Sequence, residues 1–130
     1  MNIVLDTNII VSAIWSPGKN ASNILMSVFS GKHTVCYDHR ILDEYRRVLH
    51  YSKFNFDERT LDLYLDPIVS FGISVVSDPL PDIKFDRDPS DKKFYEVAKF
   101  CHALLVTGNS AHFPNESFII SPSEFCDRYL

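Results

Sequence analysis

Four polar side chains in this 130-residue chain are of types that together could bind a metal ion: Asp6, Glu44, Asp91 and Asn109. Carboxylates held close together repel one another, and their pKa values rise unless a cation binds between them. Oxygen ligands suit Mg²⁺ or Mn²⁺, whereas zinc prefers histidine or cysteine. Such ions assist phosphoryl-ester chemistry by activating water and by stabilising the leaving oxygen. These four residues are therefore our candidate metal ligands.

Helical periodicity indicates where two of the acids point. In the stretch from residue 39 to about 50, Glu44 lies at the edge of the apolar face, and Asp43 lies on the opposite, solvent side. Asp91 falls in the first turn of a later helix, within the apolar face that contains Phe94 and Val97. A charged group in an apolar face costs free energy unless it is paired or metal-bound. We therefore expect Glu44 and Asp91 to lean inward.

Each candidate also has an ordinary structural explanation. Asp6 could cap the helix that follows it, and Glu44 could form a salt bridge at the rim. Asp91 could complete a capping-box-like turn with Asp88, which is itself the expected N-cap. The segment 107–109, Thr-Gly-Asn, could be a simple turn. These alternatives remain open at the level of the sequence.

The elements that must position these residues alternate along the chain. Short apolar, β-branched runs indicate strands over residues 2–5, 33–37, 73–77 and 103–107, with a weaker fifth run at 117–120. Helical stretches lie over residues 8–15, 21–30, 39–50, 57–65 and 88–102, and a closing helix starts at 121. Pro67 predicts that the helix from residue 57 breaks or kinks before Gly72. The Pro- and Asp-rich stretch 77–88 predicts a loop.

This alternation predicts an α/β fold with three layers, α/β/α, around a mainly parallel sheet of four to five strands. In open parallel sheets, ligands bind at the carboxyl ends of the strands. Asp6 directly follows the first expected strand, and Thr107 and Asn109 follow the fourth. We therefore expect these three side chains at the same edge of the sheet.

Length and composition narrow the class of protein. The chain is expected to form one domain over residues 1–130, because 45% of its residues are apolar and can build a core. Thirteen basic and seventeen acidic residues give a net charge of −4, which disfavours a protein that coats nucleic acid by charge alone. The three cysteines lack metal-ligand spacing, and no stretch has the character of a signal peptide or a membrane span. These features predict a cytoplasmic protein.

Five motifs carry a resemblance to a known family. They are Ile3-Val4-Leu5-Asp6-Thr7-Asn8 before an apolar helix, Glu44 within LDEYRRVL, Asp88-Pro89-Ser90-Asp91-Lys92-Lys93-Phe94, LLVTGNSAHFP, and ISPSEF. In this order they span nearly the whole chain, which resembles a PIN domain of the bacterial toxin-component branch related to VapC. The resemblance implies a Mg²⁺- or Mn²⁺-dependent endoribonuclease, usually the toxin of a type II toxin–antitoxin pair.

The resemblance also implies roles for individual residues. The catalytic and metal-binding positions correspond here to Asp6, Glu44, Asp91, Asn109 and Thr107. The family commonly has aspartate at the fourth of these positions, so Asn109 carries one formal charge fewer and leaves open whether one or two metal ions bind. Thr107 would orient the attacking water or a ligand. His112, in the segment His-Phe-Pro, corresponds to a residue of the family's motif and is expected to pack within its loop.

Substrate and partner contacts follow from the same resemblance. Asn8 matches the amide that the family usually places beside the site and is a candidate substrate contact. RNA phosphates could be bound by Lys19, Arg87, Lys92 and Lys93, although exposed basic side chains on helices are more often only solvated surface. Trp15 or Tyr37 could stack a base, although core packing is the more frequent role of such side chains. The implied partners are the RNA substrate, a cognate antitoxin that inserts a segment near the acidic groove, and a second copy of the chain in a homodimer.

Three other functions compete with this interpretation. The chain could be an inactive PIN-like module that only binds a protein, or a housekeeping nuclease in RNA processing. A phosphatase or a receiver-type domain also uses Mg²⁺ beside an aspartate at a strand end. A haloacid-dehalogenase-like phosphatase would need D-x-D-x-T after the first strand, and the segment from Asp6 to Ile10 lacks the second Asp and the Thr.

Overall fold

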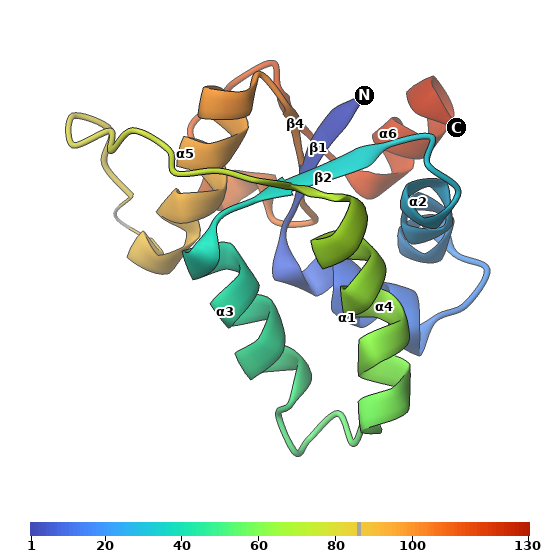
Figure 1. Ribbon diagram of the computed structural model, residues 1–130. Helices are drawn as coiled ribbons and strands as arrows, with labels where there is room; N and C mark the ends of the chain where they lie inside the picture. The colour runs from blue at the N-terminus through green and yellow to red at the C-terminus, as the bar shows by residue number, and fades with distance from the viewer. Residues whose placement is uncertain (86) are drawn as a thin grey trace.

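One parallel sheet organises the chain, of which a computed structural model describes residues 1–85 and 87–130. Its strand order is β3-β2-β1-β4-β5 (Figure 1). The strands are β1 (Asn2–Leu5), β2 (Thr34–Tyr37), β3 (Ile73–Ser74), β4 (Leu104–Val106) and β5 (Ile119–Ile120). Every neighbouring pair is parallel. The expected parallel sheet is therefore confirmed.

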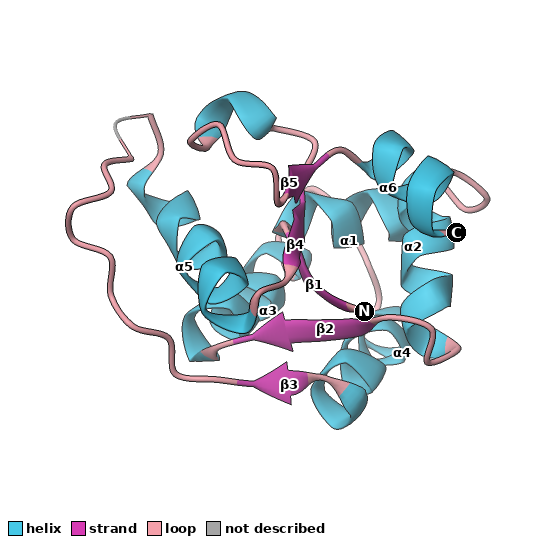
Figure 2. Ribbon diagram, turned by 90° about the horizontal axis from the view of Figure 1, so that it is seen from above, coloured by secondary structure: helices cyan, strands magenta, loops and turns pink. Residues whose placement is uncertain are grey.

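Helices cover both faces of this sheet, so the predicted three-layer α/β/α arrangement is also confirmed. Helix α5 contacts β1, β2 and β4 on one face, whereas α2 packs with α1, α4 and α6 on the other (Figure 2). Helix α3 packs against both α1 and α5. The helices are α1 (Thr7–Trp15), α2 (Asn20–Phe29), α3 (His39–Leu49), α4 (Glu58–Phe71), α5 (Lys92–Cys101) and α6 (Pro122–Tyr129). Two 3₁₀ turns are η1 (Pro89–Asp91) and η2 (Ser110–His112).

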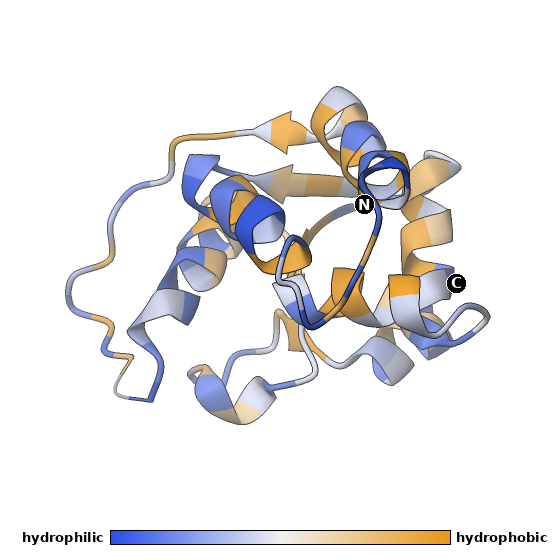
Figure 3. Ribbon diagram, turned by 90° about the horizontal axis from the view of Figure 1, so that it is seen from below, coloured by the Kyte–Doolittle hydropathy of each residue, from blue (hydrophilic) through white to orange (hydrophobic). Residues whose placement is uncertain are grey.

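The core lies between the sheet and its helices. Residues 3–5 of β1 are fully buried, as are Val35, Leu105 and Val106 on the neighbouring strands. Figure 3 shows these strands as hydrophobic segments enclosed by helices that carry hydrophilic residues on their outer sides. A central strand buried on both faces explains the continuous apolar run at the start of the chain.

Capping side chains define where several helices begin. Asp38 accepts a hydrogen bond from the Ile41 backbone N–H (3.0 Å), and Asp57 accepts one from the Thr60 backbone N–H (2.7 Å). At the start of α6, the Ser121 hydroxyl accepts a hydrogen bond from the Glu124 backbone N–H (3.2 Å). Asp88 is the N-cap of η1, because its side chain accepts from the Ser90 backbone N–H (3.0 Å).

Helix α4 differs from the sequence prediction. It continues through Pro67 to Phe71, whereas we expected a break or kink before Gly72. Proline removes one backbone donor, and its ring crowds the carbonyl four residues earlier, so it destabilises a helix interior unless other contacts compensate. Leu65 and Ile68, on either side of Pro67, are buried against the core, and this packing stabilises the turn.

The segment after β3 also differs. The strand has two residues rather than the five expected over 73–77, because the chain leaves the sheet after the bond from the Val75 N–H to the Tyr37 carbonyl. The chain then runs around the outside of α5 (Figure 2). The described residues of the expected loop 77–88 contain no strand or helix, and residue 86 lies outside them. None of the helices in the described residues combines the length and apolar character needed to cross a membrane.

Candidate functional site

The carboxyl edge of the sheet positions Asp6 beside Thr107. Leu5 of β1 pairs with Val106 of β4, so the residues that follow them emerge next to each other. The Thr107 hydroxyl donates to Asp6 Oδ2 (2.7 Å), and both side chains are buried. Asp6 is the N-cap residue of α1 and forms no standard side-chain capping bond, but the backbone N–H groups of Asn8 and Thr7 lower its pKa, so the capping alternative stays open beside the site role. Thr107 fixes the orientation of the Asp6 carboxylate.

Glu44 approaches Asp6 from α3. The phenol of Tyr45 donates to the Leu5 carbonyl (2.6 Å), which holds α3 against the end of β1. The Thr7 hydroxyl donates to Glu44 Oε2, and the Lys93 ammonium lies 2.7 Å from Glu44 Oε1. The Glu44 side chain is only 12% exposed, whereas Asp43 is exposed, as the helical periodicity predicted.

Asp91 approaches from the opposite side, at the junction of η1 and α5. Its side chain is 13% exposed and makes no capping bond to α5. His112 Nδ1 lies 3.5 Å from Asp91 Oδ2. Asp88 forms its hydrogen bonds with Ser90 instead, so the capping-box alternative does not describe this turn.

The three carboxylates influence one another electrostatically. Burial raises the pKa of Asp6, and the negative charge of Glu44 raises it further, while the Thr107 hydrogen bond opposes both. The pKa of Asp91 is raised to about 6, first by burial and then by the charges of Asp6 and Asp88, with a smaller contribution from Glu44. His112 opposes this shift. A divalent cation bound nearby would reduce the repulsion between these carboxylates, and their oxygen atoms are ligands that such a cation prefers.

The described residues bring one group of possible ligand atoms within metal-binding distance of one another, and Asp6 and Glu44 are not in it. Oxygen atoms of Asp88 and Asp91 and a ring nitrogen of His112 all lie within 4.8 Å of one another. Only Asp91 belongs to the set predicted from the sequence, and His112 was expected to pack in its loop. Its imidazole instead faces the Asp91 carboxylate. No pattern in the sequence predicts this contact, because it depends on where η2 meets η1.

Asn109 stands at the border of the site. It is exposed, and its backbone N–H donates to the Thr107 hydroxyl (3.0 Å). Its backbone thus supports the hydroxyl that orients Asp6. The role of its side chain as a metal ligand stays a prediction.

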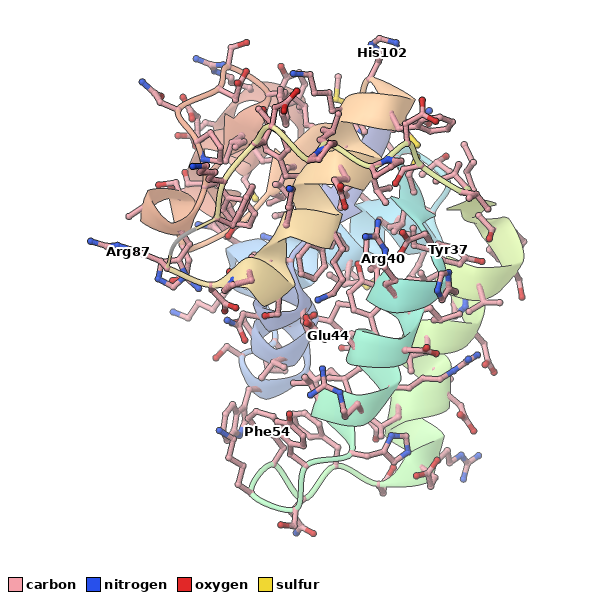
Figure 4. All side chains as sticks on the ribbon, turned by 90° about the vertical axis from the view of Figure 1, so that its left-hand side faces the viewer. Tyr37, Arg40, Glu44, Phe54, Arg87 and His102 are labelled. Carbon is pink, nitrogen blue, oxygen red and sulfur yellow. The ribbon has the colours of Figure 1, made fainter. Side chains whose placement is uncertain are left out.

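A groove between α3 and the start of α5 opens onto Glu44. Its volume is ≈ 450 Å³, and its basic lining residues are Arg40, Arg47, Lys92 and Lys93. Figure 4 shows Arg40 and Glu44 along α3, with Arg87 at the outer side of the same face. Arg40 forms salt bridges with Asp38 (2.7 Å) and Glu96 (2.8 Å), and Lys93 forms one with Glu44. Both cations are therefore already paired within the protein. Arg47 was not predicted as a substrate contact, because nothing in the sequence distinguishes it from the other basic surface residues.

The remaining substrate candidates have different environments. Asn8, Lys19 and Arg87 are exposed. Tyr37 packs in the core and does not offer a surface for stacking a base, because its ring is buried and its hydroxyl donates to the Val69 carbonyl (3.2 Å). Trp15 is 58% exposed.

The protein is thus a three-layer parallel α/β domain with acidic side chains near the carboxyl edge of its sheet, a donor chemistry that fits a divalent cation. The family model for the PIN domain matches residues 2–111, and the chain belongs to this family. The fold is similar to that in the crystal structure of VapBC2 from Rickettsia felis bound to a DNA fragment from their promoter. That similarity has a TM-score of 0.60 at 20% identity, covering 93% of this chain and 98% of the other. No match was found among curated proteins.

Proposed function

We propose that this protein is a metal-dependent endoribonuclease that hydrolyses RNA phosphodiester bonds. The observation that carries the proposal is that Asp6, Glu44 and Asp91 come from three separate elements and lie near enough for their charges to interact: beyond the effect of burial, Glu44 raises the pKa of Asp6, and Asp6 and Glu44 both raise the pKa of Asp91. PIN domains are typically metal-dependent nucleases, which supports the same reaction class. Residues 1–130 would then act as one nuclease domain.

The proposed site works through positioned oxygen atoms. Asp6, Glu44 and Asp91, with Asn109 beside them, would hold Mg²⁺ or Mn²⁺, whose charge activates water and stabilises the leaving oxygen. Thr107 holds the Asp6 carboxylate, and the Thr7 hydroxyl bonds Glu44. Two of the three acids are thus oriented by hydroxyl groups before any cation arrives, and such supporting bonds typically strengthen metal binding.

The substrate would follow the groove between α3 and α5. Arg47 and Lys92 line it and could bind phosphates, with the exposed Arg87, Lys19 and Asn8 as further contacts. Lys93 bonds Glu44, so it would reach a phosphate only after a metal ion takes over that carboxylate. Because the whole chain carries a net charge of −4, RNA binding would depend on these local cations and would weaken with salt.

The biological role we propose is the toxin of a type II toxin–antitoxin pair, acting as a homodimer in the cytoplasm. The fold similarity to the Rickettsia felis VapBC2 structure supports the toxin role. The three free cysteines support a reducing compartment such as the cytoplasm. A cognate antitoxin would then bind near the acidic groove. A housekeeping nuclease in RNA processing would use the same site without an antitoxin.

One observation favours a second candidate, an inactive PIN-like module that only binds protein. The Lys93 ammonium lies against Glu44 and supplies positive charge where a metal ion would act. Calorimetry with Mn²⁺ separates the two candidates. A nuclease binds the ion and loses affinity in the Asp6→Asn variant, whereas the module binds no ion in either form.

Cleavage of RNA tests the proposal directly. Purified protein is incubated with a mixture of single-stranded RNAs in Mg²⁺, in Mn²⁺ and in EDTA, and the product ends are mapped. We expect cleavage only with a divalent ion, and a loss of about 100-fold or more in Asp6→Asn, since a metal ion contributes several kcal/mol to such reactions. Wild-type rates in a folded Asp6→Asn variant, or cleavage of a generic phosphate monoester instead of RNA, would contradict it.

A further inference from the structure

Four aromatic side chains form a cluster beyond the carboxyl-terminal end of α3; we call it the aromatic cluster, and it consists of Trp15, Tyr51, Phe54 and Phe56. Tyr51, Phe54 and Phe56 are nearly parallel, with interplanar angles of 13° and 11° and centroid separations of 6.4 and 5.4 Å. Trp15 meets Phe54 edge-to-face at 5.1 Å and Phe56 at 6.1 Å. Trp15 ends α1, so the cluster joins two elements.

Packing explains only the inner half of the aromatic cluster. Phe54 and Phe56 are half-buried and pack against the core. Trp15 and Tyr51 project outward from them, with 58% and 39% of their surface exposed. Large aromatic side chains are costly to leave in water, and those that remain exposed together commonly mark a binding surface.

The aromatic cluster is continuous with the groove that leads to Glu44. Arg47 lines the groove, approaches Glu44 at 4.0 Å and donates to the Tyr51 hydroxyl (2.8 Å). Figure 4 shows Phe54 beyond the end of α3 on the face that carries Glu44. At 1.5 Å per residue, α1 carries Trp15 about 12 Å from Thr7, the residue that bonds Glu44. A strand of a few nucleotides could therefore reach both places.

Charges around the aromatic cluster suit a polyanion with aromatic bases. The Lys53 ammonium lies 5.2 Å from the Phe54 ring centroid and 6.0 Å from that of Tyr51. The acids of the adjoining segment have other partners. Glu58 pairs with His50 (2.5 Å), and Asp57 caps α4.

We infer that the aromatic cluster binds the bases of single-stranded RNA by stacking, while Arg47 and Lys53 bind the flanking phosphates. This inference rests on the proposed ribonuclease function and adds the path of the strand beyond the cleaved bond. Cations placed over the rings, and continuity with the groove, favour RNA over a protein partner that would cover an apolar face. Stacking tolerates any base, so this surface would contribute affinity rather than sequence recognition.

Trp15 is the only tryptophan in the chain, so its fluorescence reports on the cluster directly. The protein, kept in EDTA to prevent hydrolysis, is titrated with single-stranded RNA of about 12 nucleotides, within the length range of stacking sites. We expect saturable quenching of the emission, less quenching by an oligonucleotide with abasic positions, and weaker binding as salt rises.

Variants extend the test to affinity, measured by the anisotropy of a labelled RNA. Trp15→Ala is expected to weaken binding about tenfold or more, and Trp15→Phe to retain most of it. Lys53→Glu, a change at an exposed position, should weaken binding even if Trp15→Ala folds poorly. Phe71→Ala is the matched control, because Phe71 is also an exposed aromatic residue but lies at the end of α4, outside the groove lining.

The outcomes distinguish this inference from the proposed function. Unchanged emission and unchanged affinity in Trp15→Ala and Lys53→Glu, in a protein that still cleaves RNA, overturn the stacking site alone and leave the cluster as a protein-binding surface. Quenching without any metal-dependent cleavage overturns the proposed function and leaves the RNA-binding site standing. A defect of equal size in Phe71→Ala also overturns the inference.

Discussion

Asp91 combines a partly buried carboxylate with three acidic neighbours, and its pKa of about 6 has a consequence for stability. The folded state binds a proton more tightly than the unfolded state, where the group titrates near 3.8. Metal-free protein therefore loses stability as pH rises from about 4 to above 6. Since each pKa unit corresponds to about 1.4 kcal/mol, the loss of stability from this group is of the order of 3 kcal/mol.

The Asp91→Asn variant tests this prediction. In EDTA at pH 8 it should be more stable than the wild type, and near pH 4 the two should be nearly equal, as measured by urea unfolding. Asp43→Asn, an exposed change on α3, is the control and should show no such dependence. An Asp91→Asn variant less stable than the wild type at pH 8 would show that the carboxylate is instead held by a favourable partner.

Where the acidic side chains of the proposed site lie could be predicted from the sequence, but the hydrogen bonds that they form could not. Asp6 could be placed because it follows a strand, and Glu44 and Asp91 because periodicity indicates which helix face they occupy. The contact between Thr7 and Glu44 depends on how α3 packs against the end of β1, where the Tyr45 hydroxyl donates to the Leu5 carbonyl. Such tertiary contacts leave no periodic signal in the chain.

At the scale of elements, alternation of strands and helices predicted the fold, but the lengths of elements depended on packing. Helix α4 passes through Pro67 because buried neighbours support it, and β3 is short because the chain turns away after Val75. The boundary between α4 and β3 depends on Gly72. A Cβ atom there would lie 2.8 Å from the Val35 carbonyl oxygen and would also meet the Ile68 carbonyl oxygen.

We therefore predict that Gly72→Ala destabilises the protein by about 2 to 3 kcal/mol, because backbone atoms cannot move aside cheaply. The free energy of unfolding in urea measures the effect. Gly108→Ala is the matched control, since no atom lies within 4 Å of its Cβ position, and it should change stability by less than about 0.5 kcal/mol. Equal losses in the two variants would mean that space at Gly72 does not define this boundary.

At the scale of the whole molecule, metal binding at the proposed site would be coupled to folding, because Asp6, Glu44 and Asp91 come near one another only when β1, α3 and the start of α5 are assembled. An ion that binds the folded state alone stabilises it by about 2.7 kcal/mol at 100 times its Kd. For a chain of this length that corresponds to a rise in Tm of roughly 10 °C. We expect this rise with Mn²⁺ in calorimetric scans, and none with a monovalent salt at the same ionic strength. Asp6→Asn should lose most of the rise while Asp43→Asn keeps it, and an equal rise in both variants would mean that the ion binds outside the proposed site.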